Sequence, residues 1–350
     1  MSNIEGLEVS FAPAHDAERQ AIISKEHGFY IRHPPKPHLL SNPTTSEDEL
    51  FQTIHMGAVE IDKHKWLLVI DGLVKRPFAV TFEQLLTFPS TEITSFHECF
   101  GSPLTPPMTA LWRIGNVIWT GVPLRVLLFH AHPLPSAQYV WSEGLDSGVF
   151  ADVYADRYQK DLPLSKALCP EVLVAYMMNG ELLGKKSGGP VRLVVPGWFG
   201  TNSTKWLSKL SLQEGRAPGP YTNRFYNIKD PDSEDGTIKP VWEVDVNSMI
   251  VRPAPDTVLR GREVDVEGWA WSHDGVAKVE LSSDGGNLWT EAQLEPRKDF
   301  SWQRFSLQLR LTSGSHTLIA RATSKSGKCQ AMSGWRNHVH SVDVQLEDVE

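Results

Sequence analysis

One cysteine that could do chemistry, Cys99, lies where a strand-like run meets turn residues, in the segment ITSFHECFGSPLTPP. A thiolate at the end of a strand is held by a rigid element, and its sulfur suits soft or high-valent metals. His97 is on the same strand face but about 7 Å away along the backbone, too far to serve as the base of a nucleophilic thiol. No CxxC or HxxH motif lies nearby, so a metal bound by Cys99 would have to bring its own organic ligands. A small buried core residue is the alternative.

A second stretch, PVRLVVPGWFGTNSTKW, combines a basic residue in an apolar strand with a polar loop. Arg192 must meet an anion or reach the surface, so a bound phosphate and an edge salt bridge are both open. The loop residues Ser203, Thr204 and Lys205 can present donors to an oxyanion, although polar loops are common.

Other candidates have simpler interpretations when taken alone. Arg32 and His33, in YIRHPPKP, form a basic spot that is typical of a solvated surface. Trp112 and Tyr176 lie in strand-like segments and are typical of packed core aromatics.

Length, charge and cysteine content exclude several classes of protein. The 350 residues are enough for two domains, and a net charge of −8 disfavours a nucleic-acid or anionic-membrane surface. No stretch approaches the roughly 18 apolar residues that cross a bilayer, and the first residues do not have the pattern of a secretory signal. Three scattered cysteines form no disulfide framework. We therefore expect a cytoplasmic protein without membrane or nucleic-acid partners.

The distribution of patterns predicts an α+β part followed by a β-only part. Thr81 and Gln84 have the spacing of a capping box before a short helix that Pro89 ends, and residues 123–132 have helical periodicity. Residues 227–240 are polar and charged, as in a linker. Beyond them, short alternating strands with regular turns are typical of a β-sandwich.

Several segments, in this order, resemble the sulfite oxidase family of molybdenum–molybdopterin oxidoreductases. They are HECFG, ALWRIGNVIWTGVPL, VLVAYMMNGELL, PGWFGTNSTKWL and VELSSDGGNLW, and the resemblance extends over about residues 29–340. It implies a mixed α+β molybdopterin-binding domain, residues 1–235, and an immunoglobulin-like dimerisation domain, residues 236–350. A homodimer is therefore expected.

The resemblance also implies roles for individual residues. Cys99 matches the thiolate that ligates molybdenum, and the dithiolene of the pterin would supply further sulfurs. The residues that match cofactor contacts are Tyr30, Arg32, His33, Asp146, Ser187, Arg192, Ser203, Thr204 and Lys205. Those that match the catalytic oxyanion pocket are Arg32, Trp112 and Tyr176, together with Cys99.

The chain departs from the family pattern at three places. Ser187 stands where the family usually has histidine, and Ser102, Pro103 and Leu104 replace a loop that carries asparagine and arginines. The C-terminal arginine of the family pocket has no clear counterpart, so either Arg336 or Arg113 would complete the pocket.

The activity that the resemblance implies is oxygen-atom transfer to a small sulfur oxyanion, most simply the oxidation of sulfite to sulfate. No haem, flavin or nicotinamide motif is visible, so electrons are expected to pass to an external acceptor, a cytochrome-like protein or dioxygen. The alternatives are reduction of nitrate or a sulfoxide at the same centre, and a cofactor-binding relative with impaired catalysis.

Overall fold

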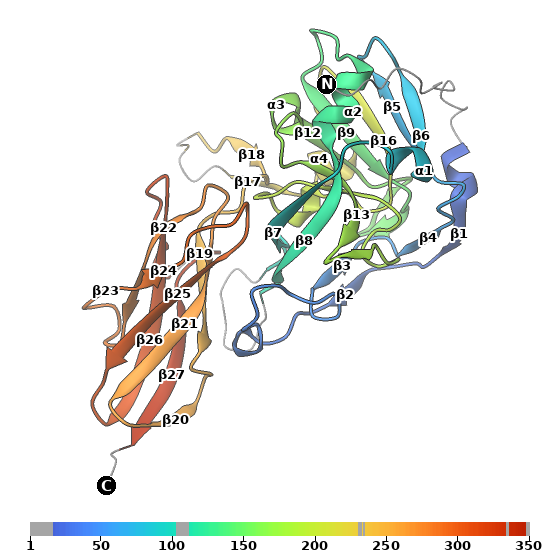
Figure 1. Cartoon of the computed structure of the whole chain (residues 1–350). Helices are drawn as coiled ribbons and strands as arrows, with labels where there is room; N and C mark the ends of the chain where they lie inside the picture. The colour runs from blue at the N-terminus through green and yellow to red at the C-terminus, as the bar shows by residue number, and fades with distance from the viewer. Residues whose placement is uncertain (1–16, 103–111, 230–232, 234, 334–335, 348–350) are drawn as a thin grey trace.

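The structure is a computed structural model that describes residues 17–102, 112–229, 233, 235–333 and 336–347. It forms two bodies side by side, an N-terminal one in blue to yellow and a C-terminal one in orange to red (Figure 1). Both are built mostly of strands, and the helices are few and short. The expected α+β class is therefore correct only in the coarse sense that helices and strands occur together. Its helical share is small because most helices end after one turn.

Two sheets dominate the N-terminal body. One has the order β12–β9–β16–β5–β6, and its strands are Gln159–Pro163, Tyr139–Gly144, Leu207–Gln213, Leu67–Gly72 and Phe78–Thr81. The other has the order β14–β13–β8–β7, with β15 paired to β13, and its strands are Glu181–Leu182, Leu173–Met178, Ile114–Pro123, Thr91–Glu98 and Arg192–Val194. Leu68 and Leu210 of the first sheet and Val122 and Val174 of the second belong to one buried apolar cluster. The two sheets therefore share a core.

Short ribbons and helices surround these sheets. The two-stranded ribbons are β1–β4 (Ile22–Lys25, Val59–Ile61), β2–β3 (Tyr30–Arg32, Gln52–Ile54), β10–β11 (Gly148–Phe150, Val153–Ala155) and β17–β18 (Asn227–Lys229, Ile238–Pro240). The α-helices are α1 (Phe82–Leu85), α2 (Leu124–Ala131), α3 (Leu164–Ala167) and α4 (Pro220–Asn223). Short 3₁₀ helices form at Ala17–Ala21, Pro37–Leu39 and Gly200–Asn202. Within the described ranges, no helix is long and apolar enough to cross a membrane.

The local helix signals are confirmed. The Thr81 hydroxyl accepts a hydrogen bond from the Gln84 backbone N–H, and the Gln84 side chain accepts one from the Thr81 N–H, as in a capping box. The helical periodicity of residues 123–132 corresponds to α2, which follows Pro123. Two reciprocal hydrogen bonds and the apolar spacing are local, so the sequence alone specifies them.

The C-terminal body consists of two sheets around one apolar core. One sheet has the order β19–β21–β25–β24, with strands Asn247–Arg252, Glu263–Trp271, Gln303–Arg310 and Gln293–Leu294. The other has the order β20–β27–β26–β22–β23, with strands Thr257–Arg260, His340–Glu347, Gly314–Ser324, Val276–Ser282 and Thr290–Glu291. Val266 and Phe305 of the first sheet and Val279 and Leu318 of the second are buried in the same cluster. The alternating strands thus point one face inward, as their sequence predicts.

The C-terminal body packs against the edge strand β7. The backbone N–H of Phe96 donates to the Phe300 carbonyl, and the Phe300 N–H donates to the Thr94 carbonyl, both at 3.0 Å. The indole N–H of Trp271 donates to the Glu98 carboxylate at 2.9 Å, and both side chains are buried. The second body therefore supports the strand that ends immediately before Cys99.

We expect Trp271→Phe to lower the apparent free energy of unfolding by about 1–3 kcal/mol, because the buried Glu98 carboxylate loses its donor. Urea unfolding followed by intrinsic fluorescence measures this change. Trp289→Phe is the matched control, since the Trp289 indole bonds only to the Gly286 carbonyl in a surface turn. Equal effects of the two substitutions would contradict the proposed support of β7.

Candidate functional site

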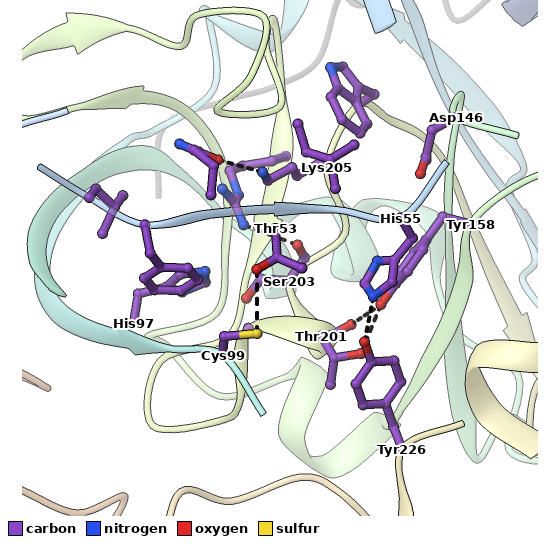
Figure 2. A pocket seen from close by; sticks show the side chains of 17 residues that line it. Thr53, His55, His97, Cys99, Asp146, Tyr158, Thr201, Ser203, Lys205 and Tyr226 are labelled. Atoms are coloured by element: carbon purple, nitrogen blue, oxygen red, sulfur yellow. Dashed lines mark hydrogen bonds between the residues drawn. The ribbon is translucent and has the colours of Figure 1, made fainter. Parts of the chain in front are cut away.

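A pocket with about 680 Å³ of empty space, part of it open to solvent, lies in the N-terminal body. Figure 2 shows the side chains around it, most of which come from the segment that includes β3, the end of β7 and the loop that follows β15. The lining residues are Leu50–His55, His97, Cys99, Asp146, Tyr158, Arg192, Gly200, Thr201, Ser203, Lys205, Trp206 and Tyr226.

Cys99 is placed by the first residues after β7. Its backbone N–H donates to the Arg113 carbonyl at 2.9 Å, which extends the β7–β8 pairing by one residue. Its sulfur accepts a hydrogen bond from the Gly101 N–H at 3.3 Å and lies 3.6 Å from the Thr53 hydroxyl, seen opposite it in Figure 2. The sulfur also lies 3.9 Å from Nη1 of Arg113. A thiol at the cavity wall, surrounded by donors, is well placed to act as a thiolate ligand.

Two cations in the lining have no carboxylate partner among the described residues. Arg192 donates to the carbonyls of Ser187 and Ser203 at 3.0 and 3.1 Å, and burial lowers its pKa to about 9. Lys205 donates to the Gln52 side chain and to the Lys186 carbonyl, and burial lowers its pKa well below the usual value. Asp146 opposes the fall in the Lys205 pKa, but neither cation forms an ion pair among the described residues, so the cavity favours an anionic ligand.

Asp146 gives the cavity one acidic group. Its Oδ1 atom is buried and has no hydrogen-bond partner in the described part of the chain. Burial raises the pKa of Asp146 to about 7, against the opposing effects of a backbone hydrogen bond and of Lys205 and Lys25. A buried oxygen without a donor is the kind of group that a polar ligand satisfies.

Five of the predicted residues therefore meet at this cavity: Cys99, Asp146, Arg192, Ser203 and Lys205. Two more lie directly behind it. The Ser187 hydroxyl donates to Glu47 and accepts from Gln52, while its carbonyl holds Arg192.

Thr204 is buried and hydrogen-bonded to the Ser142 hydroxyl at 2.7 Å. Both Ser187 and Thr204 are thus placed to support the lining instead of facing its space.

Tyr30, Arg32 and His33 are not among the residues that line the cavity. β2 pairs with β3, and β3 supplies the lining. The Arg32 guanidinium donates to the carbonyls of Leu50 and Glu47. The Nζ atom of Lys186 lies 4.0 Å from the centroid of the Tyr30 ring, and His33 is exposed. The charge of Arg32 is still close enough to contribute, after larger effects, to the lowered pKa of Lys205, and contact of these three residues with the cofactor stays a prediction.

The two predicted pocket aromatics also lie elsewhere. Trp112 packs against His340 of the C-terminal body, with ring centroids 4.8 Å apart. Tyr176 is buried in the core between the sheets, beside Phe82. Neither residue is among those that line the cavity, and their role in an oxyanion pocket stays a prediction.

Of the altered loop, Ser102 is buried and its hydroxyl accepts from the Arg113 N–H, whereas Pro103 and Leu104 lie outside the described residues.

The sequence analysis did not identify two residues that line the cavity, His55 directly after β3 and Tyr226 directly before β17. The His55 imidazole and the Tyr226 hydroxyl are hydrogen-bonded at 2.5 Å (Figure 2). Burial is the main cause that lowers the pKa of His55 to about 3, and the positive charges of Lys205 and Arg113 lower it further. This imidazole is therefore neutral near pH 7. Burial raises the pKa of Tyr226. The available signal was the run of polar residues, Gln52, Thr53 and His55, between the apolar Phe51 and Met56.

The raised pKa of Asp146 predicts a pH dependence of stability in the cofactor-free protein. A carboxyl with a pKa of about 7 in the folded state and about 3.8 when unfolded contributes stability below pH 3.8 that is lost as pH rises through 7. Asp146→Asn is therefore expected to flatten the fall in unfolding free energy between about pH 4 and 8, by an amount on the order of a few kcal/mol. Urea titrations at several pH values measure this.

Glu98, whose pKa burial also raises to about 7, keeps part of the slope in both proteins. Parallel pH profiles of wild type and Asp146→Asn would contradict the assigned burial of Asp146.

Comparison with known proteins gives the family. The model of the oxidoreductase molybdopterin-binding domain matches residues 55–221, and that of the Mo-co oxidoreductase dimerisation domain matches residues 238–345. The mouse mitochondrial sulfite oxidase is 31% identical over 85% of this chain and 59% of its own length. Chicken sulfite oxidase is 30% identical over 85% of this chain and 70% of its own length. The chain thus spans about three fifths of the mouse relative.

A solved structure supports the same relation. The sulfane dehydrogenase SoxCD from Paracoccus pantotrophus superposes with a TM-score of 0.76 at 28% identity, covering 97% of this chain and 92% of the matched one. The donors of the cavity fit the molybdenum–molybdopterin cofactor of this family, with one thiol for the metal, unpaired cations for phosphate and an unsatisfied carboxyl oxygen. The chain belongs to the sulfite oxidase family of molybdopterin oxidoreductases.

Proposed function

We propose that this protein oxidises a small sulfur oxyanion, most simply sulfite to sulfate, at a molybdenum–molybdopterin cofactor. In this reaction sulfite gains one oxygen that derives from water, and two protons and two electrons leave. The electrons pass to an external acceptor, either a cytochrome-like protein or dioxygen. The relatives named sulfite oxidase and the likeness to sulfane dehydrogenase support sulfur as the oxidised element.

One observation carries the proposal: the Cys99 sulfur opens into a cavity that also contains Arg192 and Lys205 without carboxylate partners among the described residues. In the proposed enzyme, the Cys99 thiolate holds the metal, and Arg192, Ser203 and Lys205 hold the phosphate of the pterin. The bound cofactor supplies the oxygen-atom transfer chemistry. The protein contributes positioning and charge compensation in a space with little water, where fixed donors act most strongly.

The His55–Tyr226 pair is proposed to face the reacting anion from the side opposite the phosphate-binding cations. The neutral imidazole and the phenol can share a proton along their hydrogen bond. Either group can then donate a hydrogen bond to an oxygen of the substrate without adding net charge.

We also propose that the chain divides into domains at residues 1–235 and 236–350 and that the second is immunoglobulin-like and forms a homodimer. The family matches on either side of the polar segment, and the name of the second match, support this division. The large apolar side chains exposed in the described part of residues 236–350 are Ile238, Val258, Leu288 and Met332. The cytoplasmic location stays a prediction from the sequence.

The central test is metal analysis of purified protein together with a sulfite-oxidation assay that uses an artificial acceptor. Wild type is expected to contain molybdenum and to oxidise sulfite, whereas Cys99→Ser is expected to lose turnover and keep the fold, because the metal loses its protein ligand. Cys169→Ser is the control, since that thiol is outside the cavity and donates to the Ser165 carbonyl.

Near wild-type sulfite oxidation by Cys99→Ser would contradict the metal assignment. Turnover of nitrate or methionine sulfoxide with a reduced dye, without sulfite oxidation, would instead support the reductase alternative. Bound molybdenum without any of these activities would support the impaired relative.

The dimer is tested by size-exclusion chromatography with light scattering. We expect a mass twice the 39.2 kDa of one chain, independent of loading concentration over the micromolar range. A mass of one chain at every concentration would contradict the proposed homodimer.

A further inference from the structure

Lys160 is a buried cation that the proposed chemistry does not use. It lies on β12, where its backbone pairs with Ser142 of β9, and its side chain is only 1% exposed. Because side chains alternate along a strand, Lys160 points to the same face as Leu162, which is in the shared core, and Tyr158, which lines the cavity. Lys160 itself is not among the lining residues, so it lies behind the cavity wall.

The charge of Lys160 has little support from the protein around it. Among the described residues its Nζ atom makes one hydrogen bond, to the Tyr221 carbonyl at 2.9 Å, and no ion pair. The adjacent Asp161 carboxylate is bound instead by Arg216, at 2.6 and 3.0 Å. Burial lowers the pKa of Lys160 to about 8, opposed by the charge of Asp161 and assisted by that of Arg216. A buried ammonium with so few partners costs stability, and a neutral side chain of similar shape is often more stable.

The carbonyl that Lys160 holds lies at the end of α4. The backbone N–H groups of Arg224 and Phe225 both donate to the Pro220 carbonyl, at 3.0 and 2.9 Å, so no backbone donor reaches the Tyr221 carbonyl in the described structure. The last carbonyls of a helix need partners from outside the helix. The Lys160 ammonium supplies this partner and ties the end of α4 to β12.

The turn after α4 carries Tyr226 in a strained conformation. Its φ angle is 56°, in the left-handed region that a bulky residue rarely adopts unless the surrounding structure holds it there. The Tyr226 hydroxyl is hydrogen-bonded to the His55 imidazole (Figure 2), and Nζ of Lys160 lies 5.6 Å from the centroid of the Tyr226 ring. The Asn227 side chain donates to two backbone carbonyls of the same turn. Lys160 and Asn227 thus both restrain the turn that places Tyr226.

We propose that Lys160 is a positioning residue that acts through Tyr226: its ammonium fixes the turn after α4, so that the Tyr226 hydroxyl stays on the His55 imidazole. The inference rests on the proposed function in one respect, because it takes the His55–Tyr226 pair to face the substrate anion. A neutral side chain of the same length would stabilise the fold and release the turn. Lys160 therefore lowers the stability of the protein while it fixes the geometry of the site.

The test uses Lys160→Met, which keeps the length of the side chain and removes its charge and its hydrogen bond. Lys209→Met is the matched control, because Lys209 lies on β16 of the same sheet, outside the cavity lining, and has a carboxylate partner, Asp71, at 2.9 Å. Three quantities are measured: the urea midpoint of the cofactor-free protein, the ring-nitrogen NMR signals of its labelled histidines, and kcat and KM for sulfite in cofactor-loaded protein. Tyr226→Phe identifies the His55 signal and shows its position without the hydrogen bond.

Lys160→Met is expected to raise the urea midpoint, because a buried charge is removed. Its His55 signal should move to the position found in Tyr226→Phe, and kcat for sulfite should fall about 10- to 100-fold through misplacement of the pair. The double variant Lys160→Met/Tyr226→Phe should have the kcat of Tyr226→Phe alone, since both changes act through one hydroxyl. Lys209→Met should keep the wild-type kcat and the wild-type His55 signal.

A His55 signal in Lys160→Met that matches wild type would overturn the inference. A lowered urea midpoint in Lys160→Met would also overturn it, because Lys160 would then support the fold as a whole. If wild type oxidises no sulfite but Lys160→Met moves the His55 signal, the proposed function fails and the positioning role stands. If wild type oxidises sulfite and Lys160→Met keeps the wild-type kcat, the positioning role fails and the proposed function stands.

Discussion

The Cys99 sulfur can ligate a metal only if β7 carries it to the cavity wall and holds it there. β8 pairs with one edge of β7, and Phe300 of the C-terminal body bonds to the other. Trp271 donates to the Glu98 carboxylate one residue before the thiol. A ligand fixed by contacts on both sides keeps its geometry when the metal changes charge, which is what pre-organised redox sites require.

Charge is the second constraint on this site. The chain carries a net charge of −8, so the overall field repels an anion, and the attraction must be local. Arg192 and Lys205 are buried and donate to neutral oxygen acceptors, and Nη1 of Arg113 lies 3.9 Å from the Cys99 sulfur. Unpaired buried cations destabilise the empty protein, and an anionic cofactor and substrate would relieve that cost.

The sequence predicted the features that depend on local patterns. The capping box at Thr81, the strand that presents Cys99 and the basic stretch from Arg192 to Lys205 all follow from spacing within a few residues. It missed contacts that depend on register between distant segments. Arg32 and His33 have suitable chemistry but do not line the cavity, whereas β3, the antiparallel partner of β2, leads directly to His55 at the cavity wall. No local pattern distinguishes two neighbouring strands that both carry basic residues.

The bond between the Cys99 sulfur and molybdenum is tested most directly by X-ray absorption at the molybdenum edge. Loaded wild type and loaded Cys99→Ser are compared for the number of sulfur atoms around the metal. The account predicts one sulfur fewer in the variant, since the dithiolene of the pterin remains in both proteins. An unchanged sulfur number would contradict it, because the metal would then have no bond to this side chain.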